Sequence, residues 1–208
     1  MTRHANNVKT MLVLIAAAAW LTPAMPNAQA ASAQALVALL KKGGYVLVMR
    51  HASSPREAPD ARSANPDNVK AERQLDEAGR RGSIAMGKAV RDLHIPIGEV
   101  LSSPTYRALE TVRLAELPNV QSHPELGDGG QSMQGSSAAQ GEWLRERAGR
   151  LPKGTNTIIV THMPNISRAF PAWGTVADGE VVVVGRDGDR GVKPLGRIKI
   201  EDWPSLRR

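Results

Sequence analysis

The stretch of sequence that decides the fold is residues 73–116, RQLDEAGRRGSIAMGKAVRDLHIPIGEVLSSPTYRALETVRLAE. Apolar residues recur at helical spacing over Asp76–Leu93, which predicts a helix. Glu99–Ser102 is a short, mostly apolar run that predicts a strand. Ser103-Pro104 is typical of an N-cap followed by proline in a first helical turn, so a second helix is expected over Pro104–Leu117. The stretch is therefore a helix–strand–helix unit.

Helices and strands also alternate on both sides of this unit. The other expected helices are Ala33–Lys42, Glu142–Arg150 and Pro164–Phe170. The other expected strands are Tyr45–Met49, Thr157–Thr161, Glu180–Val184 and Gly196–Ile200. Arg186-Asp187-Gly188-Asp189 is a turn signal that joins the last two strands as an antiparallel hairpin. The alternation predicts a three-layer α/β fold, in which helices flank a mainly parallel sheet with this late hairpin. Ser53–Ala71 and Gly127–Gln140 are expected to be long loops.

The composition is typical of one compact globular domain. The chain has 208 residues, with 27 Lys and Arg against 20 Asp and Glu, and a formal net charge of +7. It has no cysteine, which excludes a disulfide framework, a cysteine-ligated metal site and a thiolate nucleophile. One Phe and two Tyr offer almost no stacking platform for single-stranded nucleic acid, and the charges are scattered. We therefore expect no nucleic-acid partner.

Residues 1–30 have the pattern of a secretory signal peptide. Two cations precede the apolar run Met11–Leu21, and Ala28-Gln29-Ala30 matches a cleavage site with small residues. The alternative is a membrane anchor, but this apolar run falls short of the roughly 20 residues that span a bilayer. We expect cleavage after Ala30, a single domain over residues 31–208, and no stable membrane insertion after cleavage. The protein is then expected to be periplasmic or secreted.

Polar and cationic side chains follow three of the expected strands. They lie in Met49-Arg50-His51-Ala52, Ser102–Arg107 and Thr161–Asn165. In open α/β sheets ligands bind beyond the carboxyl ends of the strands, so two arginines and two histidines would meet in one cationic pocket. Two of the strands lead into helices that start with proline, and helix N-termini favour bound anions. The pattern predicts a small dianionic ligand, with phosphate as the first candidate.

Each of these groups also has a structural interpretation. Arg50-His51 could be a solvated strand end, Arg107 could pair with Glu110 on its own helix, and His162 could be a buried structural histidine. The joint pattern favours the ligand site, because all of the groups fall at the same end of expected parallel strands.

These segments resemble the histidine phosphatase superfamily, the phosphoglycerate-mutase-like proteins. The resemblance covers nearly all of residues 31–208 and is carried by Arg50-His51-Ala52, residues 73–116 and Val160–Ile166. The positions that match the family within the middle stretch are Leu75, Gly79, Ser102-Ser103-Pro104, Arg107, Glu110 and Thr111. Gly179-Glu180 before an apolar strand resembles the small exported members. The resemblance implies the family's fold, a mainly parallel sheet flanked by helices.

The resemblance implies a metal-independent phosphatase without a cofactor. Its substrate would be small and phosphorylated, such as an envelope sugar phosphate or another phosphomonoester. His51 would be the nucleophile that forms a phosphohistidine, and Arg50, Arg107 and His162 would hold the phosphoryl oxygens. A histidine nucleophile must be neutral, and nearby arginines lower its pKa because they disfavour a second cation. Arginine forks can also bind two phosphoryl oxygens at once.

Three residues are candidates for the proton donor to the leaving group. Glu125, in the segment Pro124-Glu125-Leu126, is our choice because a carboxylic acid can protonate the leaving alkoxide and then activate water. His123 and Asp128 are close enough in sequence to serve instead. Ser53 is a further candidate, because its hydroxyl could donate to a phosphoryl oxygen, although it could equally belong to a plain loop.

The sequence departs from the family pattern at two positions. Ala52 stands where the family has a glycine, and Met163 stands where the acid-phosphatase branch has an aspartate as proton donor. The second departure disfavours that branch, and the short chain leaves little room for the insertions of the mutases. The alternative to an enzyme is a non-catalytic phosphate- or anion-binding protein on the same fold.

Overall fold

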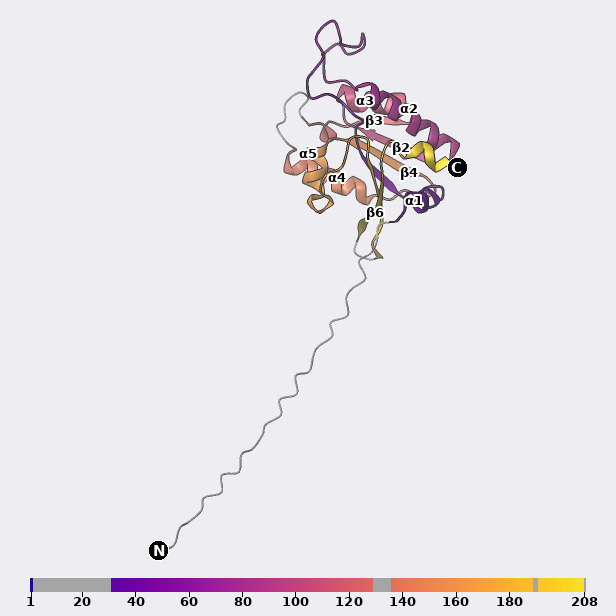
Figure 1. Cartoon of the computed structure of the whole chain (residues 1–208), viewed down its shortest axis with the longest axis vertical. Coiled ribbons are helices and arrows are strands. Elements are labelled where there is room, and N and C mark those ends of the chain that lie inside the picture. Colours follow the sequence, from indigo (N-terminus) through magenta and orange to yellow (C-terminus); the bar gives the residue numbers. More distant parts are fainter. Residues whose placement is uncertain (2–30, 129–135, 189–190, 208) are drawn as a thin grey trace.

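The computed structural model describes residue 1 and residues 31–128, 136–188 and 191–207 (Figure 1). All of the expected signal peptide except Met1 lies outside the described residues, as does part of the expected loop Gly127–Gln140. Within the described ranges, no helix has the length and apolar character needed to cross a bilayer.

Helices and strands alternate along the chain as the sequence predicts. The α-helices are α1 (Ala33–Leu40), α2 (Glu77–Asp92), α3 (Tyr106–Leu114), α4 (Ala138–Gly149) and α5 (Met163–Ala169). The strands are β1 (Val46–Arg50), β2 (Ile97–Ser102), β3 (Val120–Ser122), β4 (Asn156–Thr161), β5 (Val181–Arg186) and β6 (Val192–Ile198). Short 3₁₀ helices are η1 (Pro124–Leu126), η2 (Pro171–Trp173) and η4 (Trp203–Arg207).

The strands form one mixed sheet with the order β3-β2-β4-β1-β5-β6. The strands from β3 to β1 pair in parallel, whereas β5 runs antiparallel to both β1 and β6. The predicted α/β class, the mainly parallel sheet and the late antiparallel hairpin are confirmed. Because parallel neighbours run in the same direction, the carboxyl ends of β1, β2 and β4 meet at one edge of the sheet, where ligands bind in such folds.

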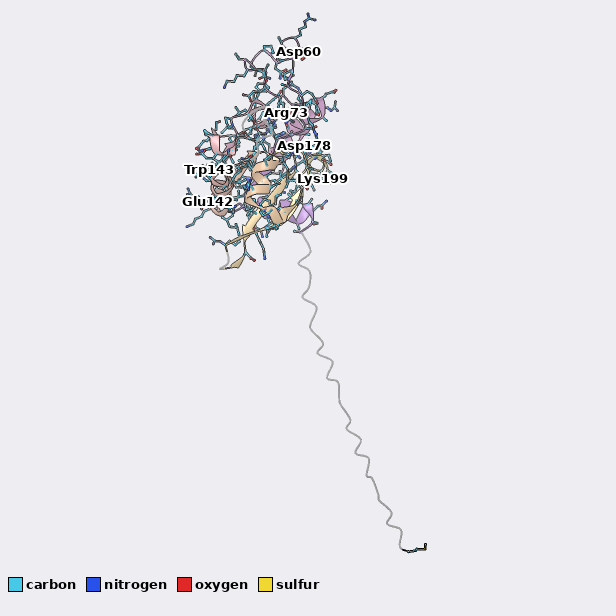
Figure 2. The ribbon with its side chains drawn as sticks, turned by 90° about the vertical axis from the view of Figure 1, so that its left-hand side faces the viewer. Asp60, Arg73, Glu142, Trp143, Asp178 and Lys199 are labelled. Atoms are coloured by element: carbon cyan, nitrogen blue, oxygen red, sulfur yellow. The ribbon has the colours of Figure 1, made fainter. Side chains whose placement is uncertain are left out.

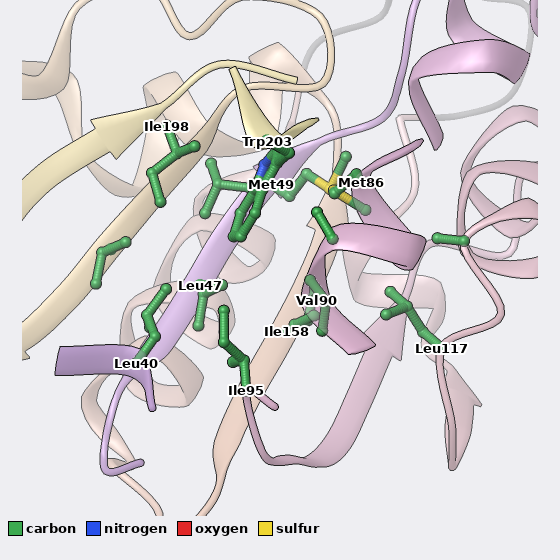
Figure 3. Packing of buried hydrophobic residues seen from close by; sticks show 14 of the residues in the cluster. Leu40, Leu47, Met49, Met86, Val90, Ile95, Leu117, Ile158, Ile198 and Trp203 are labelled. Carbon is green, nitrogen blue, oxygen red and sulfur yellow. The ribbon is translucent and has the colours of Figure 1, made fainter. Parts of the chain in front are cut away.

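Apolar side chains cover both faces of the sheet. Along β1, Leu47 and Met49 belong to one buried cluster, whereas Val46 and Val48 belong to the other, as alternation along a strand requires. The first cluster packs under α1, α2, α3 and η4, and the second under α4 and α5 (Figure 1). Trp203 of η4 is fully buried beside Met49 in the first cluster (Figure 3). The C-terminal segment therefore completes the core.

Strand β6 spans Val192–Ile198 rather than the expected Gly196–Ile200, and two further differences lie near the carboxyl end of β2. The expected N-cap at Ser103 is wrong, because α3 begins after Thr105, and the Ser103 hydroxyl instead accepts the backbone N–H of Thr105 at 3.2 Å. Strand β3 was not expected, because its three residues are exposed and form no apolar run. The extra parallel strand extends the edge of the sheet beside β2.

Candidate active site

His51 lies directly after β1 and is 3% exposed. Its backbone N–H donates to the carbonyl oxygen of Thr161 at 3.0 Å, which extends the ladder between β1 and β4. Its Nδ1 lies 2.8 Å from the carbonyl oxygen of Ala52 and must donate to it, because a carbonyl oxygen only accepts. In a neutral ring the other nitrogen, Nε2, is therefore unprotonated, and it accepts from Nε of Arg107 at 3.2 Å.

The surroundings of His51 keep its ring neutral. The pKa of His51 is lowered from 6.5 to about 3, mainly by burial and also by the charges of Arg107, Arg50 and Arg73. The hydrogen bond to Ala52 raises the pKa but does not offset these effects. A neutral ring with its lone pair on Nε2 is the form in which histidine can act as a nucleophile.

Arg107 lies in the first turn of α3, and its side chain is buried at the centre of the site. Besides His51, its Nη2 donates to Nδ1 of His162 at 3.0 Å and to Oδ2 of Asp128 at 2.5 Å. The alternative pairing with Glu110 is not observed, because Glu110 accepts from Arg80 and lies 3.9 Å from Arg113. Arg107 therefore joins the predicted site residues of three different segments.

His162 follows β4 and is 1% exposed. Its Nδ1 accepts from Arg107, so the proton of the neutral ring lies on Nε2, which is 2.8 Å from Oγ of Ser103 and 3.2 Å from Oγ1 of Thr105. Burial, together with the positive charge of Arg107, holds the pKa of His162 well below its usual range. The rings of His162 and His51 lie 5.1 Å apart, so both predicted histidines share one site.

Arg50 is the last residue of β1, and its side chain is held by the segment that precedes β5. Its Nη1 donates to the carbonyl oxygen of Val176 at 3.1 Å, and its Nη2 lies 2.7 Å from Oδ1 of Asp178. Burial raises the pKa of Asp178, against the opposite effect of Arg50. The backbone N–H of Gly179 donates to the carbonyl oxygens of both Arg50 and His51, at 3.1 and 2.9 Å. The φ of Gly179 is 73°, a value that favours glycine.

Arg73 is a site residue that the sequence analysis did not single out. Its Nη2 donates to the carbonyl oxygen of Ser54 at 3.1 Å and its Nε to that of Pro55 at 2.5 Å. Burial and the charge of Arg107 lower the pKa of Arg73, and its own charge acts on both histidines. Arg73 and Asp178 lie on the same side of the molecule and their charges interact (Figure 2). The available signal was the position of Arg73 at the start of the stretch that resembles the family.

The segment with the three proton-donor candidates is fixed against the carboxyl end of β4. The Thr161 hydroxyl donates to the carbonyl oxygen of Leu126 at 2.8 Å, and Nδ2 of Asn165 donates to those of Glu125 and Gly127 at 3.2 and 3.0 Å. These two donors flank His162 in the sequence. The contacts therefore bring η1 and the residues after it next to the histidine site.

The three candidates differ in what they contact. Asp128 reaches the centre of the site, where its Oδ2 lies 2.5 Å from Nη2 of Arg107 and 3.4 Å from Nδ1 of His162. The ring of His123 packs against Trp143, with 5.1 Å between ring centroids. Oε2 of Glu125 is buried and has no hydrogen-bond partner among the described residues. Nε2 of His123 and Oδ1 of Asp128 are also buried without a hydrogen-bond partner among the described residues, and the second carboxylate oxygen of Asp128 is held by Arg107.

The Ser53 hydroxyl is hydrogen-bonded within the protein. Its Oγ donates to Oδ2 of Asp76 at 2.6 Å, and Asp76 is the N-cap of α2. The start of α2 lies so close to this loop that a Cβ atom on Gly79 would stand 2.2 Å from the carbonyl oxygen of Ser53. Glycine at this position lets α2 approach the residues that follow His51.

The site has buried donors that an oxyanion would satisfy. Nη1 of Arg107 and Nε of Arg50 are buried and have no hydrogen-bond partner among the described residues. Unpaired buried N–H groups cost free energy, and a phosphoryl group could accept from both guanidinium groups. Across the described ranges, no group of three or more His, Cys, Asp and Glu residues is placed to hold a metal ion.

Neither family models nor curated proteins match the sequence. Solved structures match the fold. The protein histidine phosphatase SixA in complex with tungstate is 16% identical, with a TM-score of 0.55 over 76% of this chain and 98% of that chain. A putative phosphohistidine phosphatase SixA from Agrobacterium tumefaciens is 14% identical, with a TM-score of 0.51 over 74% of this chain and 97% of that chain.

A putative α-ribazole-5′-P phosphatase from Escherichia coli gives a similar match. It is 16% identical, with a TM-score of 0.51 over 74% of this chain and 96% of that chain. This chain has the histidine phosphatase fold. The resemblance that the sequence motifs indicate is therefore confirmed at the level of the fold, and the His51 cluster lies at the sheet edge where α/β folds bind ligands.

Proposed function

We propose that this protein with a histidine phosphatase fold is a phosphatase that hydrolyses small phosphate monoesters through a phosphohistidine on His51. The observation that carries the proposal is the state of the His51 ring. It is buried, it is neutral, and the hydrogen bond from Nδ1 to Ala52 leaves the lone pair on Nε2. Three guanidinium groups lie around it, which is what attack on an anionic phosphoryl group requires.

In the first step, Nε2 of His51 attacks phosphorus and the bond from phosphorus to the ester oxygen breaks. The electron pair of that bond leaves with the alkoxide, which takes a proton from the general acid. Arg50, Arg107 and His162 hold the phosphoryl oxygens, and Arg107 then donates to an oxygen in place of Nε2. Fixed cations of this kind stabilise the charge that develops in the transition state.

In the second step, water attacks the phosphorus of the phosphohistidine. The bond from phosphorus to Nε2 breaks, its electron pair returns to the ring, and the proton of the water passes to the carboxylate that served as acid. Splitting one difficult displacement into two easier ones is the gain of covalent catalysis. No metal or cofactor is part of this proposal.

We assign the acid to Glu125 and a positioning role to Asp128. Glu125 has a buried oxygen without a hydrogen-bond partner among the described residues, and its carboxylate does not form the ion pair with Arg107 that engages Asp128. Asp128 is bound to Arg107 and close to His162, so its carboxylate orients the guanidinium between the two histidines. Ser53 contributes to the phosphoryl site only if its hydroxyl leaves Asp76.

The structural neighbours support the substrate class. SixA in the matched structure binds tungstate, a tetrahedral oxyanion like phosphate, and another matched structure is a phosphoserine phosphatase mutant from Entamoeba histolytica in complex with phosphoserine. We propose further that residues 1–30 are an export signal, so that the substrate is a phosphate ester outside the cytoplasm, such as an envelope sugar phosphate.

The test is turnover of p-nitrophenyl phosphate by the purified protein and by a His51→Ala variant. We expect turnover only by the unchanged protein, together with a phosphoryl group trapped on His51 during turnover. Vanadate binding without turnover by the unchanged protein would instead identify the alternative function, a non-catalytic anion-binding protein. A His51→Ala variant that keeps full activity would refute the assignment of the nucleophile.

A further inference from the structure

A cleft of about 430 Å³ lies beside the His51 site, outside the residues that hold the expected phosphoryl group. One wall is a face of α2 with small side chains, Ala78, Gly82 and Ala85, which follow one another at helical spacing. Ile200, just after β6, and Pro204 of η4 also line the cleft. The size is within the range of small-molecule sites.

The cleft adjoins the His51 site through Asp178, which lines the cleft and also lies against Arg50. Oδ1 of Asp178 lies 2.7 Å from Nη2 of Arg50. Ser53 also lines the cleft and stands two positions after His51 in the chain. Moreover, β6 runs parallel to β1, so Ile200 lies at the same edge of the sheet as the nucleophile.

The polar groups of the cleft are hydrogen-bond acceptors or already paired cations. Its carboxylates are Asp178 and Glu201, and its arginine, Arg81, forms an ion pair with Glu77 on the same helix. A phosphoryl group on Arg50 would compete with Asp178 for the guanidinium and leave the Asp178 carboxylate facing the cleft. Hydroxyl groups of a ligand could then donate to Asp178 and Glu201, whereas a second anionic group would be repelled.

From this arrangement we infer that the cleft holds the alcohol portion of the substrate and selects uncharged, hydroxyl-bearing alcohols. The inference rests on the proposed function, because it places the phosphoryl group on Arg50. The C–H groups of such an alcohol contact the small residues of α2, and its hydroxyl groups donate to the two carboxylates. Asp178 then accepts from the alcohol portion, while Arg50 donates to the phosphoryl group.

The first test introduces a larger side chain into the cleft at a solvent-exposed position. Ala78→Leu adds bulk to the α2 wall, and Ala78 is exposed, so the fold need not adjust. We expect kcat/KM for glycerol 3-phosphate to fall about tenfold or more, because adding or removing even one methylene group in a binding pocket changes kcat/KM by about this factor. Inhibition by vanadate, which occupies only the phosphoryl site, should not change. Ala139→Leu, an exposed substitution on α4, is the matched control and should change neither quantity.

The second test compares two substrates of the same carbon skeleton. The alcohol portion of glycerol 3-phosphate is uncharged and carries two free hydroxyl groups, whereas 3-phosphoglycerate carries a carboxylate in place of one hydroxymethyl group. We expect the unchanged protein to prefer glycerol 3-phosphate, and Glu201→Gln to reduce that preference about threefold, because one exposed charge contributes little. Glu142→Gln, an exposed substitution on α4, is the control and should leave the preference unchanged.

The outcomes separate this inference from the proposed function. If p-nitrophenyl phosphate is hydrolysed but Ala78→Leu leaves kcat/KM for glycerol 3-phosphate unchanged, the cleft is not the alcohol subsite and only this inference fails. A preference for 3-phosphoglycerate would overturn the inferred selectivity. Absence of turnover with every ester, with normal vanadate binding, would overturn the phosphatase proposal itself.

Discussion

Arg107 donates from Nε to Nε2 of His51, the nitrogen that we propose attacks phosphorus. The same guanidinium donates to Nδ1 of His162, so one side chain fixes the tautomers of both rings. A lysine ammonium has no such planar fork, and it could not hold both nitrogens in the same geometry.

Replacing Arg107 with lysine should therefore reduce activity strongly. For Arg107→Lys we expect a loss of roughly a hundredfold or more in kcat/KM, about 3 kcal/mol, which is typical when one stabilising donor is removed. The measurement is steady-state hydrolysis of p-nitrophenyl phosphate. Arg113→Lys, on the exposed side of the same helix, is the control and should stay within about twofold. Similar losses in both variants would point to a general effect on α3.

The acid can be identified from its dependence on the leaving group. Glu125→Gln should slow alkyl phosphates, whose alkoxides need a proton, far more than p-nitrophenyl phosphate, whose leaving group hardly needs one. Asp128→Asn should slow both substrates to a similar degree, because the Asp128 carboxylate positions Arg107. The measurement is kcat/KM for the two substrates in each variant. The reverse pattern would assign the acid to Asp128.

The buried histidine should make the fold sensitive to acid. The pKa of His51 is about 3 in the folded protein and near 6.5 when unfolded. Above pH 6.5 His51 is neutral in both states. As the pH falls from 6.5 toward 3, the unfolded chain binds a proton that the folded protein does not, so stability decreases.

The size of this effect follows from the two pKa values. At pH 5 the contribution of His51 is about 2 kcal/mol less favourable than at neutral pH. Denaturant unfolding at pH 5 and pH 7.5 should therefore show a smaller loss on acidification for His51→Asn than for the unchanged protein. His94→Asn, at an exposed position with a φ of 55° that asparagine tolerates, is the control. Equal losses in all three proteins would contradict a buried neutral His51.

Because α2 closely approaches the loop after His51, replacement of Gly79 should reduce both stability and activity. A Cβ atom there would stand 2.2 Å from the carbonyl oxygen of Ser53, so Gly79→Ala must displace the helix or the loop. We expect a loss of stability of about 1–3 kcal/mol, together with reduced kcat. Gly149→Ala, at a helix end with nothing within 4 Å of the added carbon, should be neutral or stabilising. Thermal melting and p-nitrophenyl phosphate turnover measure both effects.

Most of the fold could be predicted from the sequence because the strands that carry the site are apolar and buried. The runs at β1 and β4 have unambiguous patterns, and the polar residues just after them, His51 and His162, lie together as expected. Strand β3 could not be predicted, since nothing in its three exposed residues favours a strand apart from its pairing with β2.

The missed parts of the site depend on contacts between distant segments. Arg73 and Asp178 are separated by more than a hundred positions; the backbone of the loop after His51 holds Arg73, and the side chain of Arg50 holds Asp178. The sequence indicates a helix cap at Ser103 because a serine followed by proline is typical of a helix start. The Ser103 hydroxyl instead lies within hydrogen-bond distance of His162. The two residues meet because β2 pairs with β4.

The position of the Gly179 turn in the sequence also determines when, during biosynthesis, β1 can acquire its second neighbouring strand. Strand β1 is synthesised early, but its partner β5 begins only at Val181. The backbone N–H of Gly179, which donates to the carbonyl oxygens of Arg50 and His51, is also synthesised late. A nascent chain that stops before this point leaves one edge of a hydrophobic strand uncovered, which invites aggregation. Such late closure predicts slow folding governed by long-range pairing.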